Sequence, residues 1–132
     1  MIRMPLRRCR NLKLETVWRK VIDLKIESRT AGRWTVLKLA GEVDVYTCGF
    51  LREAITKAAD EMKLFIAVDV QAVEFMDSSG LGVIVGAHKR LKGEEGELVL
   101  VSPNKQMRRI LALTGLDQIL TVRISVDEAI RS

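Results

Sequence analysis

The sequence is poor in the residues that build metal centres. It contains two cysteines, Cys9 and Cys48, and a single histidine, His88. The cysteines lie 39 positions apart, which is no zinc-motif spacing, and one histidine cannot complete a four-ligand site with them. We therefore expect no metal site and no cofactor, and we expect reduced thiols, as in a cytoplasmic protein.

Long apolar segments are also missing. The most apolar runs, 64–68 and 81–87, are far shorter than the roughly 20 residues that a helix needs to cross a bilayer. Basic residues interrupt the first 20 positions, so we expect neither a secretory signal peptide nor a membrane span. With 132 residues, 48% of them hydrophobic, the chain has the size and composition of one folded domain.

Positive charge is concentrated at the N-terminus. Residues 1–22 carry a net charge of +6, whereas residues 23–132 carry −1. We expect residues 1–21 to form a flexible basic extension and residues 22–132 to form the domain. Basic clusters bind nucleic acid and anionic membranes, but a solvated leader or a start codon assigned too early explains the same pattern. Because the domain is nearly neutral, we expect no direct nucleic-acid partner.

Apolar periodicity predicts strands that alternate with helices, in the order β-β-α-β-α-β-α-β-α. Strands that alternate with helices need crossover connections. We therefore predict a single α/β domain, a mixed and mostly parallel sheet with helices packed against it. The strand patterns lie at 24–29, 34–40, 64–70, 98–101 and 119–124, and the helices begin near Thr47, Ser78, Pro103 and Val126.

Capping residues mark several helix ends. Thr47 stands where it would cap the helix after the second strand. Ser102 precedes a proline, which favours a helix start there. Gly115 follows the last turn of that helix, and Ser125 lies three residues before Glu128, the spacing of a capping box.

Two loops carry the candidate functional residues. If the second and third strands are parallel, loops 41–46 and 71–77 leave from the same edge of the sheet. Ligand sites in open α/β sheets lie at the carboxyl ends of the strands. Asp44, Glu74 and Asp77 make this edge acidic.

Two adjacent serines, Ser78 and Ser79, stand at a predicted helix start. Ser78 fits an N-cap, because a hydroxyl there accepts a free backbone N–H. Gly80 and Gly82 suggest more, because each glycine costs a helix about 1 kcal/mol relative to alanine and leaves room for an approaching surface. The free N–H groups and the helix dipole would also stabilise a phosphate on Ser78. These residues leave both interpretations open.

A serine nucleophile is the enzymatic alternative, and the sequence does not favour it. Activation needs a general base within hydrogen-bond reach, and His88 lies about 15 Å along the same helix from Ser78 at 1.5 Å per residue. Asp77 is adjacent in sequence, but neighbours on a helix do not face each other. The glycine-rich segment also lacks the Lys-Ser/Thr pair of a nucleotide-binding loop. We expect no enzyme activity and no catalytic residue.

Five segments along the chain match one known pattern. They are Gly41–Asp44 with Thr47, Leu51-Arg52, Val68-Asp69, Phe75–Ile84 and Thr114–Leu116. They resemble the STAS domain (sulfate transporter and anti-sigma antagonist), and within it the bacterial anti-sigma-factor antagonists. The resemblance covers about residues 22–131, and the string Asp-Ser-Ser-Gly-Leu-Gly at 77–82 is its most specific part.

The resemblance implies a regulatory mechanism. An antagonist of this family binds an anti-sigma factor that is also an ATP-dependent serine kinase, and thereby releases a sigma factor for transcription. The kinase, which holds the ATP, inactivates the antagonist by phosphorylating the serine after the motif aspartate, here Ser78, and a serine phosphatase reverses this. The partner-binding residues that the resemblance implies are Asp44, Thr47, Asp77, Ser78, Ser79, Gly80 and Gly82.

Two features depart from the family pattern. The basic extension is longer than the compact pattern requires, and Cys48–Phe50 stands where small or polar residues and proline are more usual. STAS domains also serve as non-catalytic scaffold modules in stress-sensing and lipid-transport complexes, which is the alternative function. The combination of Ser78 with Asp44 favours the antagonist.

Deletion of residues 1–22 is expected to leave thermal stability and partner affinity nearly unchanged at physiological salt, because these residues have little apolar periodicity. Thermal denaturation and binding titrations measure the two effects. A large loss of either would contradict the prediction. Salt-sensitive DNA binding that disappears on deletion would support the nucleic-acid interpretation instead.

Overall fold

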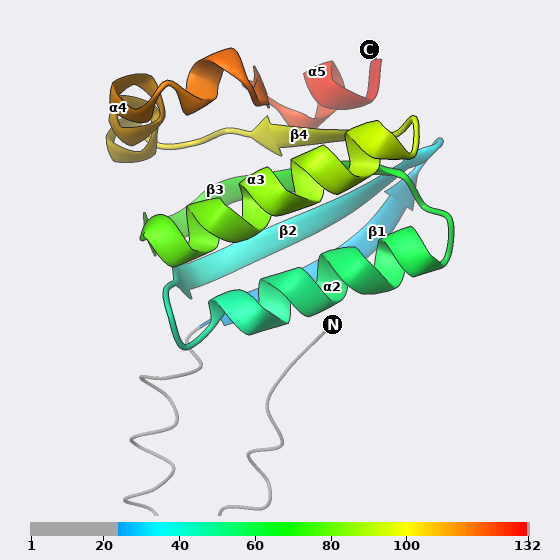
Figure 1. Ribbon diagram of the computed structural model, residues 1–132, viewed down its shortest axis with the longest axis horizontal. Helices are drawn as coiled ribbons and strands as arrows, with labels where there is room; N and C mark the ends of the chain where they lie inside the picture. The colour runs from blue at the N-terminus through cyan, green and yellow to red at the C-terminus, as the bar shows by residue number, and fades with distance from the viewer. Residues whose placement is uncertain (1–23, 132) are drawn as a thin grey trace, which may run out of the picture.

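The computed structural model describes residues 24–131, which form a five-stranded sheet flanked by helices (Figure 1). The predicted order of strands and helices is confirmed, with one short 3-10 helix added. The predicted extension at residues 1–21 and Cys9 lie outside the described residues. The elements are β1 (Leu24–Ala31), β2 (Trp34–Val43), α2 (Cys48–Asp60), β3 (Phe65–Met76), α3 (Ser78–Gly93), β4 (Glu97–Val101), α4 (Lys105–Thr114), η2 (Leu116–Gln118), β5 (Thr121–Arg123) and α5 (Val126–Arg131).

The sheet is mixed and mostly parallel, as predicted. Its strand order is β1-β2-β3-β4-β5, with β1 antiparallel to β2 and every other pair parallel. Because the crossovers all step across the sheet in one direction, right-handed connections place their helices on one face. Helices α2 and α3 accordingly lie side by side on that face (Figure 1).

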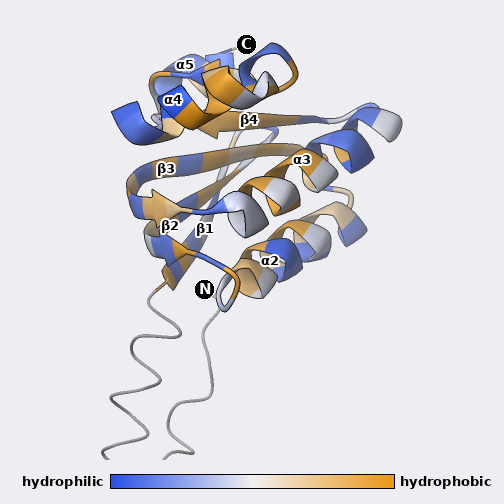
Figure 2. Ribbon diagram, turned by 60° about the vertical axis from the view of Figure 1, so that its left-hand side comes forward, coloured by the Kyte–Doolittle hydropathy of each residue, from blue (hydrophilic) through white to orange (hydrophobic). Residues whose placement is uncertain are grey.

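Each face of the sheet has its own apolar core, because successive side chains of a strand point to opposite faces. The larger core packs against α2, α3 and α4, and Leu39, Ile66 and Leu98 are fully buried in it. Helix α5 packs on the opposite face, against a cluster that includes Ala67 and Val99. Strand β4 is apolar along most of its length (Figure 2), as expected for a parallel strand covered on both faces.

Strands β2 and β3 are longer than the sequence patterns predict. We expected them to end at Ala40 and Val70, but they continue to Val43 and Met76. Two shifts in register, one on each side of Gly41, let the pairing continue past this glycine. Val43 and Met76 are also buried, so the apolar core extends to the ends of both strands. The loops that follow are correspondingly shorter than predicted.

Strand β5 is shorter than the predicted strand 119–124. The backbone N–H groups of Ile119 and Leu120 donate to the carbonyl of Leu116, at 3.0 and 2.8 Å. These local bonds form the 3-10 turn η2 and its end, so only residues 121–123 remain to pair with β4.

The start of α4 also differs from the prediction. Ser102 does not cap this helix, because its φ of +56° is left-handed, whereas an N-cap residue is normally extended. Asn104 is the cap: its backbone is extended and its Oδ1 accepts the N–H of Met107 at 2.8 Å. The predicted helix stop at Gly115 and the cap at Ser125 are both confirmed.

Helix α3 approaches the ends of β2 and β3 most closely at Gly80. A Cβ atom there would lie 2.6 Å from Val43 Cγ1 and 2.7 Å from Met76 Cγ. Glycine at this position therefore lets the first turn of α3 rest against the edge of the sheet. The surface that we expected to approach Gly80 is the chain's own sheet. At Gly82 a Cβ would meet nothing within 4 Å.

Gly80→Ala is expected to lower the free energy of unfolding by about 1–3 kcal/mol, because the added methyl group overpacks the junction with the sheet. Gly82→Ala is the matched control, and it should raise stability by up to about 1 kcal/mol through helix propensity. Urea denaturation measures both variants. Equal stability of the two would contradict this account of Gly80.

Candidate functional site

The candidate site lies at the carboxyl edge of the sheet, where β2 and β3 end side by side. Val43 and Met76 are paired in register, and the backbone N–H of Asp77 donates to the carbonyl of Val43 at 3.0 Å. Asp44 and Asp77 are the residues that directly follow these paired strand ends. The structure therefore confirms that the two candidate loops leave from one edge.

The loop after β2 is a tight turn organised by Asp44. Its Oδ1 accepts the backbone N–H groups of Tyr46 and Thr47 at 2.9 and 3.0 Å, and also the Thr47 hydroxyl at 3.2 Å. The Thr47 hydroxyl donates a hydrogen bond to the Glu42 carbonyl at 2.9 Å. Its oxygen also accepts the backbone N–H of Asp44 at 2.9 Å. Asp44 Oδ2 accepts no hydrogen bond from the described residues. One carboxylate oxygen thus holds the turn, and the other has no hydrogen-bond partner among the described residues.

Thr47 occupies the N-cap position of α2, as predicted, but its side chain does not cap the helix. It is 1% exposed, and its side chain makes no capping hydrogen bond to α2. Because its hydroxyl is already engaged within the turn, Thr47 positions Asp44 and does not itself form part of the accessible surface. Cys48, which follows it, is buried as well.

The N-cap of α3 is Asp77, and not Ser78. The Asp77 backbone is extended, and its Oδ1 accepts the N–H groups of Ser79 and Gly80 at 2.8 and 3.2 Å. Ser78 occupies the first helical position, is exposed, and forms no side-chain hydrogen bond with the described residues. The interpretation of Ser78 as a mere cap is therefore wrong. Its hydroxyl is free to react.

This cap changes the electrostatics expected at the start of α3. We expected the free N–H groups of the first turn to stabilise a phosphate on Ser78. Two of them already bind the Asp77 carboxylate, which is also a negative charge adjacent to Ser78. A phosphate group would therefore compete with Asp77 for the same donors and be repelled by it.

The groups that could activate Ser78 as a nucleophile lie elsewhere or are already engaged. His88 is 6% exposed on the buried face of α3, and its Nδ1 has no hydrogen-bond partner among the described residues. Asp77 uses its carboxylate to cap the helix. In the described part of the chain, no three His, Cys, Asp or Glu side chains are grouped to hold a metal ion. Among the described residues, therefore, neither His88 nor Asp77 forms a hydrogen bond with the Ser78 side chain.

Exposed apolar residues flank these polar groups, and the sequence patterns did not single them out. Val45 and Tyr46, in the turn after β2, are 63% and 67% exposed, and Phe75, near the end of β3, is 42% exposed. Exposed large apolar side chains are common in protein–protein interfaces. From the sequence, only the position of Val45 and Tyr46 on a loop could have indicated their exposure, and Phe75 lies within β3.

Comparison with known proteins agrees with this geometry. The family model for the STAS domain matches residues 25–129. The anti-sigma-B factor antagonist of Listeria monocytogenes is 33% identical over 77% of this chain and 89% of its own. None of the described helices is long and apolar enough to cross a membrane.

Solved structures show the same architecture. A putative anti-sigma factor antagonist from Thermotoga maritima superimposes with a TM-score of 0.77 and 26% identity, over 80% of this chain and 92% of that one. The Bacillus cell fate determinant SpoIIAA in its phosphorylated form superimposes with a TM-score of 0.67 and 27% identity, over 81% of this chain and 97% of that one. By fold, by sequence and by the arrangement of its two edge loops, this chain belongs to the STAS domain family.

Proposed function

We propose that this protein is an anti-sigma-factor antagonist that binds an anti-sigma factor with serine kinase activity and releases a sigma factor. In this proposal, phosphorylation of Ser78 weakens the complex and a serine phosphatase restores it. The observation that carries the proposal is the environment of Ser78 at the start of a 16-residue helix. Ser78 is exposed, it is not the N-cap, and its hydroxyl forms no hydrogen bond with the described residues. The names of the relatives support the choice of an anti-sigma factor as partner.

The charges at the carboxyl edge support inactivation by phosphate. A phosphoserine carries about −1.5 to −2 charges at neutral pH. It would lie beside the capping carboxylate of Asp77, on an edge that also holds Asp44 and Glu74. Two unit charges 4 Å apart interact by about 4 kcal/mol at an effective dielectric constant of 20. Burial of this charge in an interface would add a desolvation cost.

The ATP in this proposal is held by the partner. The chain has no nucleotide-binding motif, and the edge around Ser78 is acidic, which disfavours a triphosphate. The exposed apolar residues Val45, Tyr46 and Phe75 would supply the contact area that a stable protein complex needs.

Co-purification from the native host tests the identity of the partner. The tagged protein is expected to retain an ATP-binding anti-sigma factor, identified by mass spectrometry, and to lose it when that factor and ATP have phosphorylated the sample. Recovery of a lipid transporter or a stress-sensing assembly in its place would contradict the antagonist and support the scaffold alternative.

Substitutions at the two serines test the switch. Ser78→Ala should bind the anti-sigma factor and resist phosphorylation, whereas Ser78→Asp should bind more than tenfold more weakly because it adds charge beside Asp77. A discrimination of about 3 kcal/mol corresponds to more than a hundredfold in affinity, which titration calorimetry resolves. Ser79→Ala is the matched control and should still accept phosphate. A phosphate mapped to Ser79 by mass spectrometry would show that the assignment to Ser78 is wrong.

Two substitutions of Asp44 separate its charge from its role in the turn. Asp44→Asn keeps an oxygen that accepts the N–H groups of Tyr46 and Thr47, so Tm should change little. Asp44→Ala removes these bonds and should cost about 1 kcal/mol of stability. If the charge contacts the partner, both variants bind weakly or are phosphorylated slowly. Wild-type binding and phosphorylation of Asp44→Asn would contradict a role for the charge.

A further inference from the structure

Helices α2 and α3 enclose an open groove on their outer side, and we propose that it receives a helix of the anti-sigma factor. In this proposal an acidic side chain of that helix pairs with Arg52. The inference rests on the proposed function and extends the contact surface beyond the carboxyl edge. The groove has a volume of about 280 Å³ and is lined mainly by Arg52, Ile55 and Thr56 of α2 and by Gly82, Gly86 and Arg90 of α3.

The dimensions of the groove favour a protein partner over a small ligand. Pockets for small molecules enclose about 300–1,000 Å³ and bury most of the ligand. This groove is smaller and open along its length, and its two long walls are helices that lie side by side (Figure 1). Such a shape accepts side chains that project from another protein's surface.

On the α3 side of the groove, Gly82 and Gly86 have no side chains that would fill it. Residues four apart lie one above the other on the same face of a helix. Both glycines are exposed, and a Cβ at either position would meet nothing within 4 Å. The fold therefore does not require glycine here, unlike at Gly80, and glycine weakens a helix relative to alanine. What the two residues provide is space for the backbone of a partner helix to approach α3 closely.

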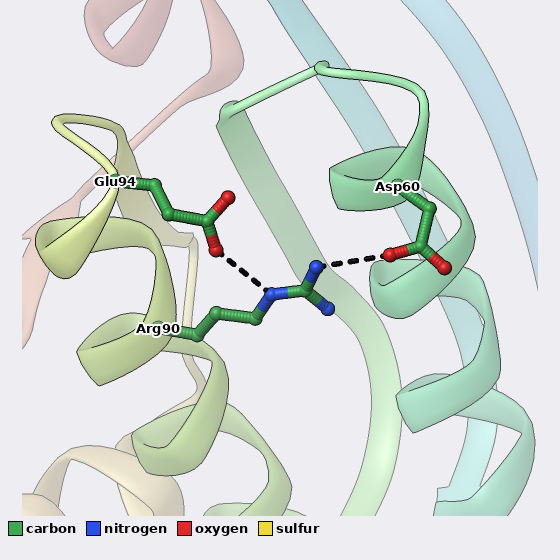
Figure 3. Close-up of polar contacts among 3 residues, drawn as sticks. All are labelled: Asp60, Arg90 and Glu94. Atoms are coloured by element: carbon green, nitrogen blue, oxygen red, sulfur yellow. Dashed lines mark hydrogen bonds and ion pairs between the residues drawn. The ribbon is translucent and has the colours of Figure 1, made fainter.

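One end of the groove is closed by an ion-pair bridge between the helices. Arg90 of α3 donates to Asp60 Oδ1 of α2 at 2.9 Å and to Glu94 Oε2 at 3.0 Å (Figure 3). The hydrogen bond to Asp60 raises the pKa of Arg90 above its ordinary value, so the bridge remains charged. Because two carboxylates already surround it, Arg90 offers little attraction to a further anion.

The other end of the groove presents an uncompensated cation. Arg52 is exposed and forms no ion pair with the described residues. A carboxylate on the partner is its natural complement, since a guanidinium group binds a carboxylate through two parallel hydrogen bonds. The cation also lies on a different element from the acidic edge, so the partner must offer opposite charges to the two regions.

The groove is continuous with the candidate phosphorylation site. Gly82 lies four residues after Ser78, about one helical turn further along the same face of α3. A helix seated between α2 and α3 would therefore extend toward Ser78. In this proposal, a phosphate on Ser78 would disturb the contact from the end of the groove that lies nearest the start of α3.

Gly86→Leu is the direct test, because a Cβ at this position meets nothing within 4 Å and the rest of the leucine side chain would occupy space in the groove. We expect an unchanged or higher Tm and at least a hundredfold weaker affinity for the anti-sigma factor that co-purifies with the wild-type protein. Gly93→Leu is the matched control at the far end of α3, where a Cβ also meets nothing within 4 Å. It should bind like wild type. A Gly86→Leu variant that binds within threefold of wild type would overturn the proposal.

Charge reversal tests the role of Arg52. Arg52→Glu should bind the same anti-sigma factor at least tenfold more weakly, whereas Arg109→Glu, an exposed arginine of α4, should bind like wild type. Equal losses in both variants would show that net charge, and not a pair with Arg52, is responsible. Failure of the wild-type protein to bind any anti-sigma factor would overturn the proposed function. If the wild-type protein binds the anti-sigma factor and Gly86→Leu and Arg52→Glu bind it equally tightly, only the groove proposal is overturned.

Discussion

The parallel pairing of β2 with β3 fixes the position of the residues at the carboxyl edge. Because Val43 and Met76 are partners in register, the chain leaves both strands at the same level of the sheet, and the bond from the Asp77 N–H to the Val43 carbonyl joins the two exits. The first turns of α2 and α3 start from this junction. A change in this register would displace Asp44 relative to Ser78 and would also remove the close contact at Gly80.

The two aspartates at this edge serve the fold and, in our proposal, also the function. Asp44 Oδ1 holds the turn after β2, and Asp77 Oδ1 holds the first turn of α3. Each carboxylate therefore stays in place at little cost, because it satisfies backbone donors that would otherwise lack partners. The same arrangement keeps two negative charges beside an exposed hydroxyl. In our proposal, this arrangement is why one phosphate added to Ser78 would weaken the complex.

The glycines of α3 separate what the fold requires from what a partner would require. Gly80 is buried and its neighbours leave no room for a side chain, so packing alone explains it. Gly82 and Gly86 face open space on the outer side of the same helix. Glycine without a steric reason is unfavourable in a helix, and the groove between α2 and α3 gives these two positions a common purpose. Arg90 and Asp60 then hold the walls of the groove together.

Local patterns in the sequence determined the order of the elements, the parallel sheet and the edge at which the candidate residues meet, because apolar periodicity and helix stops such as Gly115 depend on near neighbours. Resemblance to the STAS domain added the roles expected of Ser78 and Asp44. For α3 and α4 only the structure decided which residue is the cap, since Asp77 and Asn104 take this place instead of Ser78 and Ser102.

Burial was likewise decided by contacts between distant segments. Strands β2 and β3 run on to Val43 and Met76, because register shifts and buried side chains prolong their pairing. The groove between α2 and α3 exists only when the two helices are side by side. No periodicity along one segment reports the space between two helices, and this is why the sequence drew attention to Gly82 but neither to Gly86 nor to the groove that both residues line.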